Sequence, residues 1–132
     1  MSILSIFKTK KKKSRRAYLI AQLDAIVSKQ VRERDGYRCR KCGRKGEKGA
    51  VAHHHIFTKT RLATRWMKEN GVTLCFHCHR WAHAAGEEFR EWVLNWMPKE
   101  EYDQLYLWSQ TRASFKVCDL ELMLWGMRKD NG

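Results

Sequence analysis

The sequence predicts an α+β fold in which a small, metal-stabilised core of two short strands and a helix lies between helical segments. Two cysteine pairs, Cys39-x-x-Cys42 and Cys75-x-x-Cys78, have the spacing of zinc knuckles. The segments on both sides carry apolar residues at three- and four-residue intervals, as helices packed on a core do. With 132 residues, 43% of them hydrophobic, the chain can form one domain with a modest core.

The chain is strongly basic. It has 27 Lys and Arg residues against 14 Asp and Glu, which gives a formal net charge of +13. This balance indicates a polyanionic partner, and we expect nucleic acid. Residues 1–16 are predicted to be a flexible basic tail that contacts phosphates through lysines such as Lys11, Lys12 and Lys13. The alternative is a solvated tail without a partner.

The first helix is predicted over residues 17–35. Its apolar positions recur every three or four residues, so one face can pack on a core: Leu19, Leu23, Ile26, Val27 and Val31. Asp35-Gly36 is expected to end it.

Residues 36–86 are predicted to form the core. Glycines around the first cysteine pair favour a knuckle turn, followed by a short strand over residues 50–52. Residues 57–69 have no clean period and several charges, so they are predicted to be a functional loop. A second strand is expected over residues 72–74, and a helix is expected to begin near Cys78.

Residues 87–132 are predicted to be helical. One helix follows Gly86, a second starts at Pro98, where proline fits the first turn, and a third runs through residues 117–127. No repeat or linker divides the chain, so residues 1–132 are predicted to be a single domain.

Cysteine pairs without a secretory leader favour metal binding in a reducing cytosol over disulfides. We therefore expect a cytoplasmic protein with a structural Zn²⁺ ion, provided that the fold brings the two pairs together. The apolar residues 1–7 are too few for a membrane span, so no membrane partner is expected. Cys118 lies at a helical position and is predicted to be a small buried hydrophobe.

The histidines form a second group. His79 and His83 are four residues apart, so on a helix their imidazoles project from the same face, as two ligands of one metal must. This spacing alone is a weak signal, because core and surface histidines often have it. The preceding cysteine pair and the upstream run His53-His54-His55 strengthen it.

With Cys39-Arg-Lys-Cys42, His54-His55-Ile56, Asn70 and Cys75-Phe-His-Cys78-His79-x-x-x-His83, residues 36–84 resemble the HNH endonucleases of the ββα-metal class. The spacing is similar to that in the nuclease colicins: 15 residues from His55 to Asn70, 9 more to His79 and 4 more to His83. The cysteine frame and residues 62–66 look more like the small HNH proteins of phages. The helical flanks resemble the family only loosely.

The resemblance implies a metal-dependent DNA endonuclease. His55 would be the general base, oriented by the backbone of Asn70, while His54, His79 and His83 would hold a catalytic divalent ion. Neutral imidazole has a pKa near 6.5 and can accept a proton at cellular pH. The metal would stabilise charge on the scissile phosphate and on the leaving 3′-oxygen, so the products would be a 5′-phosphate and a 3′-hydroxyl.

His54 departs from many relatives, which have Asp at this position. Three imidazole ligands suit Zn²⁺, Ni²⁺ and Mn²⁺ better than Mg²⁺, so we expect Mn²⁺ or Ni²⁺ to support activity at least as well as Mg²⁺. The choice of ligand also depends on register, because His53 and His55 share one face of a regular strand. If the strand continued, His53 would be the alternative ligand. The family places its pair where the strand ends, so His54 is favoured, and His53 is expected to contact substrate or simply to be exposed.

Other side chains give weaker signals. Lys59, Arg61 and Arg65, in the loop before the Asn, are candidates for phosphate contacts, although exposed loop charges are often only solvated. His77 is expected to face solvent. Trp66 and Trp81 are predicted to pack in the core rather than to stack on bases.

Two other classes of protein remain open at this stage. A zinc-stabilised nucleic-acid-binding module would explain the cysteines and the charge, but not the spacing of the histidines and Asn70. A structural adaptor in phage packaging or recombination is compatible with nuclease activity. Because one HNH site cuts one strand, double-strand cleavage would require a homodimer, a phage protein partner or two successive events.

Overall fold

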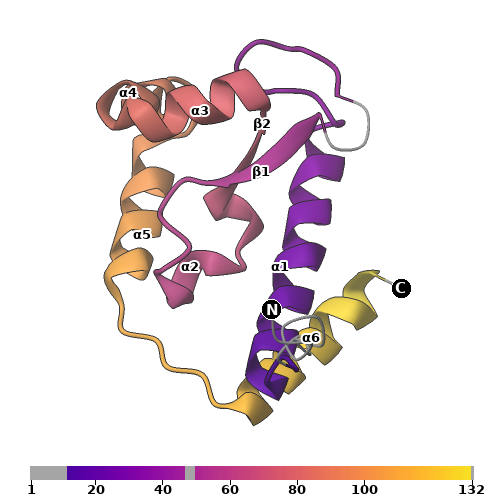
Figure 1. The fold of residues 1–132 in the computed structure, drawn as a ribbon. Helices are drawn as coiled ribbons and strands as arrows, with labels where there is room; N and C mark the ends of the chain where they lie inside the picture. Colours follow the sequence, from indigo (N-terminus) through magenta and orange to yellow (C-terminus); the bar gives the residue numbers. More distant parts are fainter. Residues whose placement is uncertain (1–11, 47–49, 132) are drawn as a thin grey trace, which may run out of the picture.

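The computed structural model describes residues 12–46 and 50–131, and Lys11 therefore lies outside the described residues. Two antiparallel strands lie near the middle of the fold and are surrounded by helices (Figure 1). The elements follow in the order α1 (Arg15–Arg34), β1 (Val51–His55), α2 (Leu62–Arg65), the 3-10 helix η2 (Lys68–Asn70), β2 (Gly71–Cys75), α3 (Phe76–Ala84), α4 (Gly86–Trp96), α5 (Lys99–Gln110) and α6 (Val117–Asn131).

Helix α1 agrees with the prediction except at its start. It begins two residues before Ala17, because the Oγ of Ser14 accepts a hydrogen bond from the Ala17 N–H at 3.1 Å and caps the first turn. Four of the five predicted apolar positions are buried, Leu19, Leu23, Val27 and Val31, and the fifth, Ile26, is partly buried. Gly36 follows with a φ of +64°, a left-handed conformation that glycine adopts without strain and that ends the helix.

Strands β1 and β2 form the sheet, with Val51 opposite Cys75 and His55 opposite Gly71. Both are longer than predicted, and β1 continues through all three consecutive histidines. Every residue of β2 is buried. The chain passes directly from β2 into α3, so the strands and this helix form a ββα unit.

Helix α3 begins at Phe76, two residues before the predicted start. Its N-cap is Cys75, whose Sγ accepts a hydrogen bond from the Cys78 N–H at 3.4 Å. The cysteine knuckle therefore also defines where the helix starts.

The segment over residues 57–69 is more ordered than a loop. It contains the short helix α2 and the start of η2, and Thr64 within it is fully buried. Helices this short are stable only through tertiary contacts, and the spacing of apolar residues in the sequence does not predict such contacts. The prediction of an irregular loop was wrong in this respect.

Two apolar clusters stabilise the fold. One lies between the sheet and helices α3 to α5, and the other joins α1 to α6. Trp81 packs against the first cluster and Trp66 belongs to the second, which confirms that both are core residues. Cys118 is exposed, and the prediction that it is buried was wrong, because α6 turns Leu120 and Leu124 toward α1 instead. No helix among the described residues is long and apolar enough to cross a membrane.

Candidate active site and metal sites

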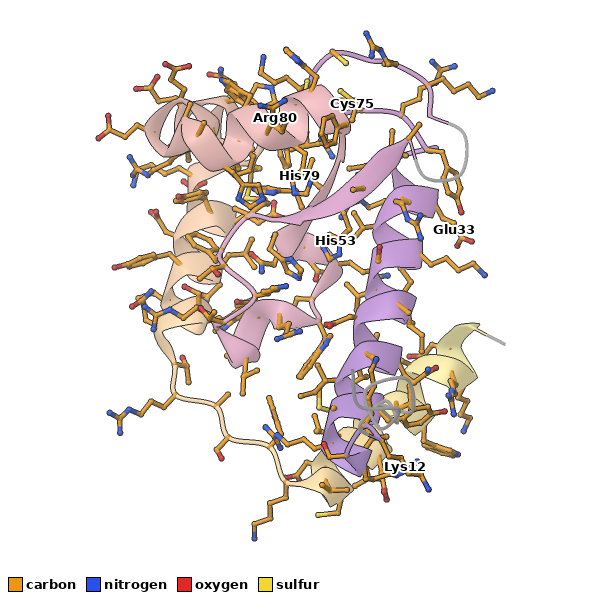
Figure 2. The ribbon with its side chains drawn as sticks, viewed as in Figure 1. Lys12, Glu33, His53, Cys75, His79 and Arg80 are labelled. Carbon is orange, nitrogen blue, oxygen red and sulfur yellow. The ribbon has the colours of Figure 1, made fainter. Side chains whose placement is uncertain are left out.

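The three consecutive histidines of β1 point to two sides of the strand. The rings of His53 and His55 lie together, with centroids 4.3 Å apart, whereas the ring of His54 lies 4.9 Å from those of His79 and His83. Figure 2 shows His79 on the α3 side of β1 and His53 on the opposite side. Strand alternation thus separates His54 from its two neighbours.

His54, His79 and His83 form a cluster with the chemistry of a metal site. Their candidate ligand atoms all lie within 4.8 Å of one another, and the Nε2 atoms of His79 and His83 are 3.1 Å apart. Two nitrogens at tetrahedral positions, each about 2.0–2.1 Å from one ion, would be about 3.3 Å apart. The donors present therefore fit a divalent ion.

The protonation of this cluster also suits metal binding. Burial, followed by the charges of His79 and His83, lowers the pKa of His54 to about 3. Burial and the charge of His83 likewise lower the pKa of His79. The rings of His54 and His79 are therefore neutral at cellular pH, and neutral imidazole is the form that binds metals.

The sequence left open whether His53 or His54 is the ligand. The strand continues through His55, the condition under which His53 was the alternative, yet His54 is the residue that faces His79 and His83. The cause is that α3 follows β2 directly and covers the His54 side of the sheet. The ligand role itself stays a prediction.

The ring of His55 is held by a backbone carbonyl. Its Nε2 lies 3.2 Å from the carbonyl oxygen of Arg65, and because a carbonyl can only accept, Nε2 carries the proton. The Nδ1 atom of the neutral ring then keeps its lone pair. Burial lowers the pKa of His55, and the Arg65 carbonyl and the Asp24 charge, which raise it, offset only part of this effect.

One cavity joins His55 to the histidine cluster. It has a volume of about 510 Å³ and is lined by all three β1 histidines together with His79, His83 and Lys59, among others. A substrate atom in this space could contact both the candidate base and an ion held by the cluster.

Asn70 ties the end of β1 to the segment that follows it. Its carbonyl oxygen accepts the Ile56 N–H at 2.7 Å, and its Oδ1 accepts the Phe57 N–H at 2.8 Å. Its Nδ2 donates to the carbonyl oxygens of Phe57 and Thr64 at 2.9 and 3.1 Å. The backbone of Asn70 thus fixes the residue after His55, whereas the ring of His55 contacts Arg65.

His53 is not simply exposed, so that half of the expectation was wrong, while its contact with substrate stays a prediction. It is half-buried against Gly71, and its Nε2 is buried with no hydrogen-bond partner among the described residues. Burial and the neighbouring charge of His55 lower its pKa to about 4. The strand pairing places it there, because His53 lies opposite Thr73 and next to the Gly71 position.

The four predicted cysteines form the second cluster, with all four Sγ atoms within 4.8 Å of one another. The Sγ atoms of Cys42 and Cys75 are 3.7 Å apart, and two thiolates about 2.3 Å from one tetrahedral Zn²⁺ ion would be about 3.8 Å apart. Figure 2 shows Cys75 where β2 passes into α3. The Arg40 N–H donates to the Thr73 carbonyl at 2.9 Å, and this contact brings the distant first pair to the second.

The thiols of this cluster differ in acidity. Burial raises the pKa of a thiol, but backbone N–H hydrogen bonds, that of Cys42 first, outweigh it and bring the pKa of Cys39 to about 7. Burial and contacts with the other thiols raise the pKa of Cys78. Four adjacent thiolates can be charged together only around a cation, so the cluster indicates zinc binding.

The predicted basic contacts lie in different environments. Lys59 is exposed and lines the cavity, Arg61 is exposed two residues further along the chain, and Lys12 and Lys13 are exposed before α1. Arg65 is 17% exposed, and its Nε and Nη2 donate to the carboxylate of Asp24, which reduces its availability for phosphate. His77 is exposed, as predicted.

Sequence reasoning missed Asp24. Its only signal was that it is the sole acidic residue in the first eighteen positions of a basic helix. Burial raises its pKa, but hydrogen bonds from Arg65 and Trp66 and the charge of Arg65 outweigh this and leave the pKa below its usual value.

Comparison with known proteins agrees with this geometry. Residues 39–85 match the HNH endonuclease family. No curated protein and no solved structure matches the chain. The match contains both cysteine pairs, the histidine cluster, Asn70 and the complete ββα unit, and the cysteine cluster fits an HNH domain of the zinc-binding kind.

Proposed function

We propose that this protein is a metal-dependent DNA endonuclease that hydrolyses phosphodiester bonds with His55 as general base. An HNH domain indicates nuclease activity or nucleic-acid binding. The observation that favours catalysis is the shared cavity, which places the candidate base beside three imidazoles suited to one divalent ion. A protein that only binds nucleic acid has no need of this arrangement.

His54, His79 and His83 would hold the ion, which supplies positive charge to the scissile phosphate and to the leaving oxygen. The Nδ1 of His55 accepts a proton from water, whose oxygen forms the new bond to phosphorus. The bond to the 3′-oxygen breaks, and that oxygen takes a proton from solvent. The products are a 5′-phosphate and a 3′-hydroxyl.

The charge of the chain supports a nucleic-acid substrate. The net charge is +13, and the exposed Lys59 lines the cavity where a phosphate backbone would approach, with the exposed Arg61 two residues further along the chain. The basic tail, with Lys11, Lys12 and Lys13, would add contacts that weaken as salt rises. A role in phage recombination or packaging, with a homodimer or a phage partner for double-strand cleavage, follows from the resemblance to phage HNH proteins.

The test is nicking of supercoiled plasmid by wild type and His55→Ala, each with Mg²⁺, Mn²⁺, Ni²⁺ or EDTA. We expect metal-dependent nicking by wild type, at least as fast in Mn²⁺ or Ni²⁺ as in Mg²⁺, and a loss of about 10²- to 10⁴-fold in the variant. Both proteins should bind DNA equally. Binding without nicking by wild type in every metal would favour the zinc-stabilised binding module instead.

A further inference from the structure

Asp24 lies on α1, outside the residues that match the HNH family, and makes three hydrogen bonds to the segment that follows β1. Its Oδ1 accepts from Arg65 Nε at 2.9 Å and from Trp66 Nε1 at 2.8 Å, and its Oδ2 accepts from Arg65 Nη2 at 2.7 Å. A bidentate contact of this kind fixes the guanidinium plane as well as its position.

The same arginine contacts the candidate base through its backbone. The carbonyl oxygen of Arg65 accepts from Nε2 of His55, so the side chain of Arg65 is held by α1 while its main chain holds the imidazole. Helix α2 has four residues and ends at Arg65, with Trp66 as its C-cap. A single helical turn has little stability of its own, so the position of this carbonyl depends on tertiary contacts. Those with Asp24 hold the side chains of Arg65 and Trp66, while α5 and Asn70 also contact α2.

We propose that Asp24 is a positioning residue for catalysis, because it fixes through Arg65 and Trp66 the carbonyl that orients the His55 ring and sets its Nε2–H tautomer. This inference rests on the proposed role of His55 as base. It extends the functional unit beyond the matched domain to α1, and it assigns Arg65 a task other than phosphate binding.

A purely structural role would have different consequences. If Asp24 only stabilised the contact between α1 and α2, its removal would lower stability and leave the tautomer and the rate of the folded protein unchanged. Asp35 offers a matched control. It is the C-cap of the same helix and also accepts two hydrogen bonds from an arginine, Arg34, at 2.9 and 3.0 Å. Arg34 also donates to the carbonyl of Gly71, the strand partner of His55, at 2.8 Å, but in the described part of the chain neither Asp35 nor Arg34 contacts the His55 ring or the Arg65 carbonyl that holds it.

The experiment compares Asp24→Asn with Asp35→Asn in the full zinc-bound chain. Long-range ¹H–¹⁵N spectra of ¹⁵N-histidine-labelled protein at pH 8 report which ring nitrogen of His55 carries the proton, with His55→Ala used to assign the signal. We expect the Nε2–H form in wild type and Asp35→Asn, and a mixture of tautomers in Asp24→Asn. The nicking rate under single-turnover conditions should fall about 10- to 100-fold in Asp24→Asn only.

DNA affinity separates this effect from electrostatics. Asp24→Asn removes a negative charge, so DNA should bind equally well or more tightly while the rate falls. The proposal is overturned if the His55 spectrum and the nicking rate of Asp24→Asn match those of Asp35→Asn. If Asp24→Asn does not fold, Trp66→Phe removes one donor to Asp24 and should shift the tautomer in the same direction. An unchanged Trp66→Phe spectrum would then count against the proposal.

The two readouts keep this inference distinct from the proposed function. If wild type nicks no DNA in any metal, the proposed function fails, while the tautomer of His55 in Asp24→Asn still decides whether Asp24 positions the ring.

Discussion

The cysteine cluster and the histidine cluster of this protein are neighbours in the fold but differ in their surroundings. The cysteine cluster has four ligands, three of them buried, and lies where the knuckle, β2 and α3 meet. The histidine cluster has three candidate ligands, of which only His54 is buried, and it opens into a cavity of about 510 Å³. Structural zinc sites are closed by four protein ligands, whereas catalytic sites keep a position free for substrate or water.

This difference indicates a division of labour between sulfur and nitrogen ligands. Cys75 is at once the end of β2, the N-cap of α3 and a member of the cysteine cluster, so metal binding there is coupled to the ββα unit itself. His79 and His83 come later on α3, and no element begins or ends at either of them. Loss of a cysteine should therefore affect the fold, and loss of a histidine should affect activity.

The largest expected effect comes from Cys78→Ser. Structural zinc contributes about 10–16 kcal/mol of apparent binding free energy in small zinc domains, more than the whole stability of most domains. We expect the variant to lose its zinc and to unfold, as measured by far-UV circular dichroism and by zinc content. Replacement of the exposed Cys118 by Ser is the control and should change neither. A folded, zinc-bound Cys78→Ser protein would contradict the structural role of the cluster.

His83→Ala should have the opposite pattern. The residue is exposed, so the free energy of unfolding should change by no more than about 0.5 kcal/mol. The variant should bind one metal ion fewer and nick DNA roughly 100-fold more slowly, the order of loss that follows removal of one electrostatic stabiliser of a transition state. His77→Ala, on the same helix but outside the cluster, is the control. Nicking at the wild-type rate by His83→Ala would remove His83 from the proposed site.

Gly71→Ala tests the packing of β2 against His53 of β1 and Val31 of α1. A Cβ atom at this position would lie 2.5 Å from His53 Nε2 and 2.8 Å from Val31 Cγ2, so the substitution should lower the free energy of unfolding by about 1–3 kcal/mol. Gly126→Ala meets nothing within 4 Å on α6 and should stabilise by about 0.5–1 kcal/mol. The measurement is urea denaturation. An equal response of both variants would mean that His53 can move away freely.

The smallest expected effect concerns pH and Asp35, which lies beside the knuckle. Burial raises the pKa of this carboxyl, but the hydrogen bond and charge of Arg34 and the N–H of Thr73 outweigh it, so the folded pKa is below the unfolded value. A lowered pKa contributes stability above the unfolded value of about 4, and this contribution is lost as pH falls through the folded pKa. Wild type should therefore be more stable than Asp35→Asn at pH 7, and the two should converge below about pH 4. A constant difference over that range would exclude this linkage.

The elements that the sequence predicted best are those whose signal is local. The spacing of Leu19, Leu23, Val27 and Val31 predicts one face of α1, and the C-x-x-C pairs predict a cluster because their geometry repeats in zinc knuckles. The end of β1 was harder to predict from the sequence, since the length of a strand depends on its pairing with β2. Asn70 was predicted as a site residue from the resemblance to the family and not from any periodic pattern in the sequence.

The contacts that prediction missed connect segments far apart in the sequence. No sequence pattern near Asp24 predicts that Arg65 and Trp66 will lie beside it, because the contact forms only when the chain folds and brings α1 to α2. The prediction that Cys118 is buried failed for a related reason. Its helix has apolar residues on more than one side, and only the position of α1 decides which side is buried.

The most direct test of the division between the clusters is a stepwise removal of metal. Purified protein is treated with increasing chelator, and native mass spectrometry, circular dichroism and plasmid nicking are followed on the same samples. We predict that the first ion leaves with complete loss of nicking and no change in fold, that Mn²⁺ then restores nicking, and that the second ion leaves only with unfolding. Nicking that persists until the protein unfolds, or that survives loss of the first ion, would contradict the account.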